Sequence, residues 1–119
     1  MAKVAITVNG TEGKNVYPPF ILGSSAAACG DEVLIFFTPG GAKAMLKGGI
    51  EKLNEAAPKL PDLVELYKGL LALNGRLLVC ELAFDVHDFT AEDLIEGTEV
   101  VGATTFIAEA HGADLTFSF

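Results

Sequence analysis

Short apolar segments alternate along this chain with segments of helical periodicity. Five apolar or β-branched runs predict strands at Val4–Val8, Glu32–Phe37, Arg76–Cys80, Thr98–Val101 and Leu115–Phe119. The second run is almost continuously apolar, which is typical of a strand covered on both faces of a mainly parallel sheet. The last run alternates apolar and polar residues, so we expect it to lie at an edge of the sheet.

Helices are predicted between these strands. Because proline is tolerated in the first turn of a helix, Pro18 and Pro19 predict a helix that begins there and runs to Ala28, with Gly30 beyond its end. The other predicted helices are residues 42–46, interrupted by Lys47-Gly48-Gly49; residues 61–73, with leucines at helical spacing; Glu92–Ile95, after a capping box that starts at Thr90; and Ala103–Ala110. Residues 53–60 give no clear pattern.

The order of these elements predicts an α/β fold with a mainly parallel sheet. The chain has 119 residues, half of them apolar, which is enough to build one core. We find no linker, no internal repeat and no low-complexity segment. The whole chain, residues 1–119, is therefore expected to form one domain, with right-handed crossovers between the strands.

The charge balance excludes some classes of partner. There are 16 acidic and 8 basic residues, for a net charge of -8. Nucleic acids and anionic membrane surfaces both require a basic surface, so neither is an expected partner. No apolar run approaches the roughly 20 residues that span a bilayer. The first residues form a predicted strand and not a signal peptide, so we expect a cytoplasmic protein in which Cys29 and Cys80 are free thiols.

Cys80 is the strongest candidate for chemistry, because it ends a predicted strand. Ligands of open α/β sheets gather beyond the carboxyl ends of the strands. A thiol has a pKa of about 8.5 and attacks as the thiolate, which a helix N-terminus or a protonated histidine such as His87 would favour. The acidic neighbours Glu81, Asp85 and Asp88 oppose this effect. Spacing alone leaves two readings open, a reactive thiol and a buried structural cysteine.

The other candidates have simpler explanations. Cys29 lies at the end of an alanine-rich helix and is interpreted as a small buried residue, and no Cys-x-x-Cys motif is present. The only histidines, His87 and His111, have no spacing that would form a metal site, and His111 suits a helix C-terminus. The segment 10–15 has the wrong spacing for a phosphate loop. No metal or organic cofactor is expected.

Three segments carry a resemblance to a known family. Residues 79–102, and more weakly residues 17–22 and 31–38, resemble the DsrE/DsrF-like sulfur-transfer family. The resemblance implies a three-layer α/β/α sandwich with a five-stranded, mostly parallel sheet, and homo-oligomers that are commonly trimers or hexamers. Some members carry a persulfide on a cysteine that matches Cys80. Residues 81–84, Glu-Leu-Ala-Phe, depart from the Ser/Met-rich stretch of close relatives.

Two hypotheses follow from this reading. In the first, the protein is a cytoplasmic sulfur carrier of sulfurtransferase type: Cys80 takes a sulfur from a donor protein and passes it to an acceptor thiol, and His87 supports it as a general acid. In the second, the protein is a non-catalytic oligomeric module that binds a small ligand or a protein at the strand ends, and Cys80 only fills space.

Overall fold

The computed structural model describes residues 1–119 and contains one five-stranded sheet, in the order β4-β3-β2-β1-β5. All four neighbouring pairs of strands are parallel. The strands are β1 (Lys3–Val8), β2 (Glu32–Phe37), β3 (Arg76–Cys80), β4 (Thr98–Val101) and β5 (Leu115–Ser118). The five predicted strands and the α/β class are confirmed, and β5 lies at an edge as expected.

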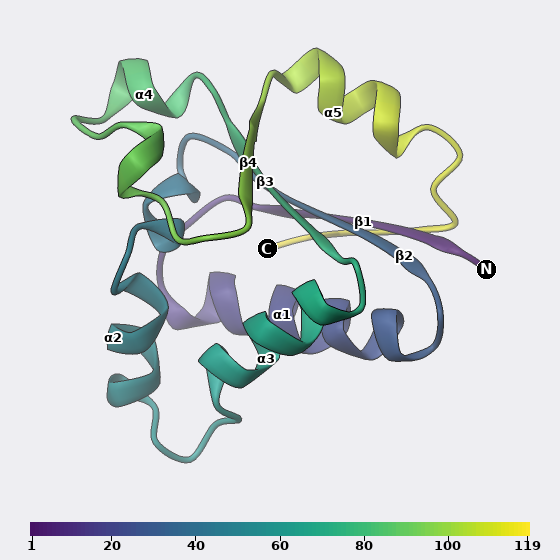
Figure 1. Cartoon of the computed structure of the whole chain (residues 1–119), viewed down its shortest axis with the longest axis horizontal. Coiled ribbons are helices and arrows are strands. Elements are labelled where there is room, and N and C mark those ends of the chain that lie inside the picture. Colours follow the sequence, from purple (N-terminus) through teal and green to yellow (C-terminus); the bar gives the residue numbers. More distant parts are fainter.

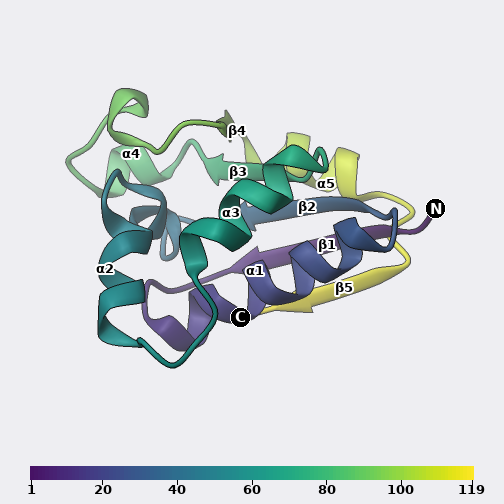
Figure 2. The same cartoon turned by 60° about the horizontal axis from the view of Figure 1, so that its bottom comes forward.

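Helices cover both faces of the sheet, which makes the predicted three layers (Figures 1 and 2). On one face lie α1 (Gly13–Ala28) and α3 (Leu63–Ala72), and on the other lies α5 (Ala103–Ala110) alone. The short elements η1 (Ala42–Met45), α2 (Gly49–Ala56), α4 (Ala83–Val86) and η2 (Ala91–Asp93) gather beyond the carboxyl ends of the strands. None of the helices has the length and apolar character that crossing a membrane requires.

The two sides of the sheet are packed unequally. Successive side chains of a strand point to opposite faces, so each strand contributes to two separate cores. The core under α1 and α3 holds 20 buried residues. The core under α5 holds six, which are Ala5, Leu34, Phe36, Leu78, Cys80 and Phe106. The α5 side is therefore the thinner layer, and Cys80 belongs to it.

Helix α1 begins earlier than the sequence predicted. It starts at Gly13, so Pro18 and Pro19 lie inside the helix and not in its first turn. The Asn15 side chain accepts a hydrogen bond from the N–H of Glu12 at 3.3 Å, which fixes the start before the prolines are reached. Each proline removes one intrahelical hydrogen bond, and burial of Pro19 against the core offsets part of that loss.

Three short elements also differ from the prediction. The helix η1 ends at Met45, just before Lys47-Gly48-Gly49, and Gly48 and Gly49 then begin α2, with Gly48 at a φ of 86°. The uncertain segment 53–60 is therefore helical in its first part. The helix predicted at Glu92–Ile95 is only the single turn η2, although the capping box is present, with the Thr90 N–H donating to Asp93 Oδ2 at 2.8 Å. The single turn α4 was not predicted.

The loop after β2 is pressed against the end of β1. Both the N–H and the hydroxyl of Thr38 donate to the Val8 carbonyl, at 3.1 and 3.2 Å. A Cβ added at Gly41 would lie 2.3 Å from the same carbonyl oxygen. This approach is closer than any side chain tolerates, so the loop that covers the sheet end depends on glycine here.

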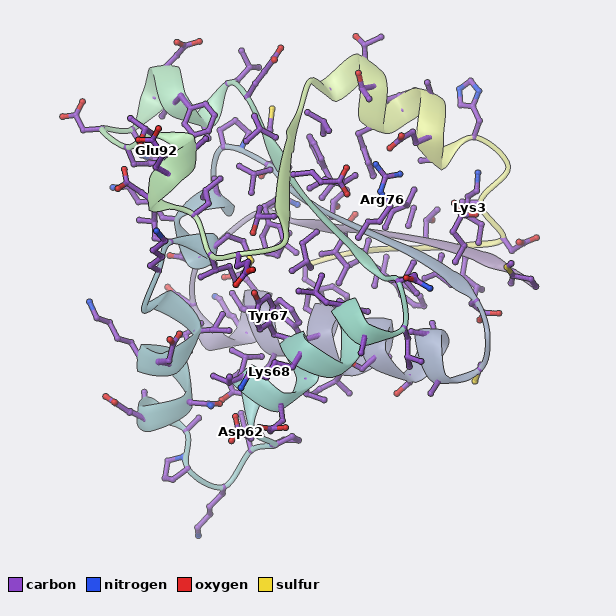
Figure 3. All side chains as sticks on the ribbon, in the orientation of Figure 1. Lys3, Asp62, Tyr67, Lys68, Arg76 and Glu92 are labelled. Atoms are coloured by element: carbon purple, nitrogen blue, oxygen red, sulfur yellow. The ribbon has the colours of Figure 1, made fainter.

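The last turn of α5 is held by charged side chains (Figure 3). Lys3 Nζ donates to the carbonyls of Glu109 and His111, at 2.9 and 2.8 Å. The Arg76 guanidinium lies 3.0 Å from the Glu109 carboxylate and makes two hydrogen bonds to Glu99, at 3.0 and 2.8 Å. The Arg76 hydrogen bonds hold the pKa of the Glu99 carboxyl below its ordinary value. These contacts join β1, β3 and β4 to the C-terminal end of α5.

Replacement of Gly41 by alanine should destabilise the fold. The added methyl must displace the Val8 backbone, at a cost of roughly 1–3 kcal/mol in the free energy of unfolding, measured by urea denaturation. Gly69→Ala is the matched control, because this helical glycine has no atom within 4 Å of the added Cβ, and it should leave stability unchanged or raise it by up to about 1 kcal/mol. A Gly41→Ala protein as stable as the wild type would contradict this account.

The Arg76–Glu99 pair should stabilise the protein only above the acid range. The pKa of Glu99 is lower in the folded protein than in the unfolded chain, so its contribution is present at neutral pH and is lost as the pH falls through the folded value. Because the Glu99 side chain is 46% exposed, we expect Glu99→Gln to cost about 1 kcal/mol or less at pH 7. The difference in free energy of unfolding between the wild type and Glu99→Gln, measured by urea denaturation, should shrink as the pH falls through the acid range. A difference that grew as the pH fell would contradict this prediction.

Candidate functional site

Cys80 is the last residue of β3, at the predicted place. It pairs with Val101 of β4, and the N–H of Glu81 donates to the Val101 carbonyl at 2.9 Å. Its side chain lies on the α5 face of the sheet, in the small core with Phe36 and Phe106. Only 2% of Cys80 is exposed. The thiol is therefore at the functional end of the sheet but under cover, so a reagent can reach it only when the covering residues move.

The start of α5 lies beside Cys80, because only Gly102 separates the helix from β4. The first N–H groups of any helix lack intrahelical partners, and no side chain caps those of α5. They form the positive end of the helix dipole, which favours a nearby thiolate. The Glu81 carboxylate opposes this effect, because it also lies at the start of α5. A Cβ added at Gly102 would lie 3.1 Å from Glu81 Oε1.

His87 is engaged elsewhere. Its Nε2 lies 3.0 Å from the carbonyl of Pro39, to which it must donate, and its ring stacks at 6.0 Å on that of Phe89. The side chain thus ties the segment after β3 to the loop after β2. No hydrogen bond joins His87 to Cys80, and His87 is outside the core that contains the thiol. Its supporting role in catalysis stays a prediction.

The interpretation of Cys29 as a buried residue was wrong. Cys29 is exposed, in the position just after α1. The residues of α1 that face the sheet include Phe20, Gly23 and Ala27, and a position two residues beyond Ala27 points to the opposite side of a helix. His111 follows the end of α5, as predicted, with its side chain exposed.

An exposed apolar pair lies just beyond Cys80 and was missed by the sequence reasoning. Leu82 is 53% exposed and Val86 is 65% exposed. They are four residues apart, at the N-cap and at the last residue of the single turn α4, and the acidic Glu81 and Asp85 are also exposed there. The signal in the sequence was the spacing of two apolar residues within an acidic segment. Together these residues, here called the α4 surface, present apolar and acidic groups next to the end of β3.

The two surface depressions of the chain lie away from this region. One depression is at the amino ends of the strands, with Met1, Asp31 and Asn74 in its lining. The other lies beside the connection between α2 and α3, around Asn54 and Pro58. Neither is lined by Cys80 or His87. No three His, Cys, Asp or Glu side chains converge in an arrangement that could hold a metal ion.

Comparison with known proteins gives consistent results. Among curated proteins, the uncharacterized protein MJ0760 of Methanocaldococcus jannaschii is 32% identical over 104 residues, which cover 86% of this chain but 37% of that protein. The sulfur carrier protein DsrE2 of Allochromatium vinosum is 26% identical, over 83% of this chain and 86% of its own. The crystal structure of the ychN protein from E. coli matches the fold with a TM-score of 0.77 at 18% identity, and each chain is covered completely.

The family model gives the broadest sequence match. The description of that family is the DsrE/DsrF-like family, and its model matches residues 2–119. The match includes all five strands and the Cys80 region. On this ground the chain belongs to the DsrE/DsrF-like family.

Proposed function

We propose that this protein is a cytoplasmic sulfur carrier that holds a persulfide on Cys80 and passes it to a partner thiol. The observation that carries the proposal is the position of Cys80, at the carboxyl end of β3 and beside the uncapped start of α5, in a chain of the DsrE/DsrF-like family. A relative of 26% identity is a named sulfur carrier, which supports the same assignment.

The chemistry requires one nucleophile and no external oxidant. The Cys80 thiolate attacks the outer sulfur of a donor persulfide, forming a new S–S bond while the donor's own S–S bond breaks and the donor leaves as a thiolate. The proton of the outer sulfur remains on it. An acceptor thiolate then attacks that outer sulfur, and Cys80 leaves as a thiolate. The uncapped start of α5 lies two residues beyond Val101, the partner of Cys80 in β4, and this placement supports the proposed chemistry.

The α4 surface is the proposed place for a partner to dock. Leu82 and Val86 offer exposed apolar area two and six residues after Cys80. The acidic side chains around them, and the net charge of -8, fit a donor or acceptor protein with a basic surface. The departure of residues 81–84 from close relatives lies on this surface, so it would bear on the choice of partner.

The proposal includes a homotrimer or homohexamer. Both edges of the sheet, β4 and β5, are free to pair in the single chain, and Val100 and Leu115 on them are exposed. Sedimentation of the purified protein should therefore give the mass of a trimer or hexamer. A monomer at micromolar concentration would contradict this part of the proposal and leave the chemistry of Cys80 untouched.

Sulfur loading tests the carrier function. A Cys29→Ser protein, which keeps only the Cys80 thiol, should gain one sulfur atom when incubated anaerobically with inorganic polysulfide, as measured by intact mass. It should lose that atom to glutathione. The Cys29→Ser/Cys80→Ala protein should gain none, with urea unfolding as the check that it is folded.

The reciprocal variant supplies the control. Cys80→Ala keeps the exposed Cys29 thiol, which is free to react with polysulfide without any carrier role. Loading of Cys80→Ala that equals the wild type, together with no loading of Cys29→Ser, would overturn the proposal and assign the sulfur chemistry to Cys29. No loading of either variant would support the alternative, a binding module in which Cys80 only packs.

A further inference from the structure

We propose that Phe106 controls access to Cys80, and that the first turns of α5 form a lid which opens locally to expose the thiol. The biological meaning of this lid rests on the proposed function, because a carrier needs a thiol that is shielded at rest and reachable during transfer. The lid itself is argued from packing alone.

Phe106 is the side chain of α5 that closes the small core. It is the only residue of α5 among the six buried residues of that core, and it is 7% exposed. Its ring stacks on Phe36 of β2, with centroids 4.3 Å apart and planes inclined by 8°. Phe36 pairs in register with Leu78, the residue that precedes Cys80 on the same face of β3. The ring of Phe106 therefore fills the space between α5 and the sheet in the same small core that contains the thiol.

The two ends of α5 are attached very differently. The C-terminal end is held by Lys3 and by Arg76 through its ion pair with Glu109. The N-terminal end follows Gly102, has no side-chain cap, and exposes the three residues 103–105. Phe106 is thus the main apolar anchor of the first turns. Segments with few buried apolar contacts open at lower free energy than the whole fold, so the first turns of α5 should open before the sheet does.

The alternative routes to the thiol are closed by larger structures. The opposite face of β3 belongs to the core of 20 residues under α1 and α3, and β2 and β4 pair with β3 on both sides. To expose Cys80 from any of these directions, the sheet or the main core must be disrupted. Movement of the first turns of α5 separates the Phe106–Phe36 stack and leaves the core of 20 residues in place.

Alkylation of the native protein tests the lid. In the Cys29→Ser background only Cys80 can react, and its rate with iodoacetamide is followed by intact mass. Phe106→Ala should raise the rate by at least about tenfold, because the first turns then lose their anchor. Ile107→Ala is the matched control: Ile107 is the next residue and is 57% exposed, so its removal should leave the rate unchanged. Equal rates in Phe106→Ala and in the Cys29→Ser parent would overturn the proposal.

The urea dependence of the rate separates local from global opening. In the folded Cys29→Ser protein, opening of a lid exposes little surface, so the alkylation rate should rise much less steeply with urea than the unfolding equilibrium does. A slope equal to that of global unfolding would show that Cys80 is reached only by unfolding and would overturn the proposal. This measurement needs no Phe106 variant, and Phe106→Leu provides a milder substitution if the alanine protein does not fold.

The lid and the carrier function can fail separately. Iodoacetamide reports access and involves no sulfur transfer. Fast local alkylation without sulfur loading would refute the carrier proposal and support the lid. Normal sulfur loading with rates that do not respond to Phe106 would refute the lid and support the carrier.

Discussion

The burial of Cys80 under a single helix is the structural constraint on which the proposed function depends. Parallel pairing of β3 with β4 places the thiol at the carboxyl end of the sheet, and the same pairing directs the chain through Gly102 into α5. The helix whose uncapped start follows the strand partner of Cys80 is therefore also the helix that covers this face of the sheet.

The two faces of the sheet are packed unequally, and this difference explains why the α5 side is expected to move more easily than the side under α1 and α3. The side under α1 and α3 holds most of the buried residues, so it maintains the sheet and the register of the strands. The side under α5 is thin and is secured at one end of the helix by Lys3 and Arg76. This unequal packing is what would let the proposed carrier open the α5 side while the rest of the fold persists. The acidic, partly apolar α4 surface lies near the same end of the sheet, where a partner would meet the opened site.

The strands could be predicted from sequence because their apolar runs are local signals. The position of Cys80 followed from the run that ends there, and the edge position of β5 followed from its alternation. The start of α1 could not be predicted from the prolines, because the contact between Glu12 and Asn15 decided it. Cys29 is exposed because it follows the last residue of α1 and lies on the side of the helix away from the sheet, an orientation that the alanine-rich composition did not reveal.

The cover over Cys80 was not predictable, because it joins residues distant in sequence. Phe36 and Phe106 are separated by most of the chain, and their stack depends on the parallel pairing of β4 with β3, which leads the chain into α5. The orientation of His87 toward Pro39 is likewise set by the loop after β2. Pairing patterns of this kind carry no local signature, although they decide whether a thiol at a strand end is open or shielded.

The most direct test of the account is to locate the sulfur on the wild-type chain. The protein is loaded by a persulfide donor, the remaining thiols are blocked under denaturing conditions, and peptide mass spectrometry determines which cysteine carries the additional atom. The account predicts the added sulfur on the peptide containing Cys80. An added sulfur found only on the peptide containing Cys29, or on neither peptide, would contradict it.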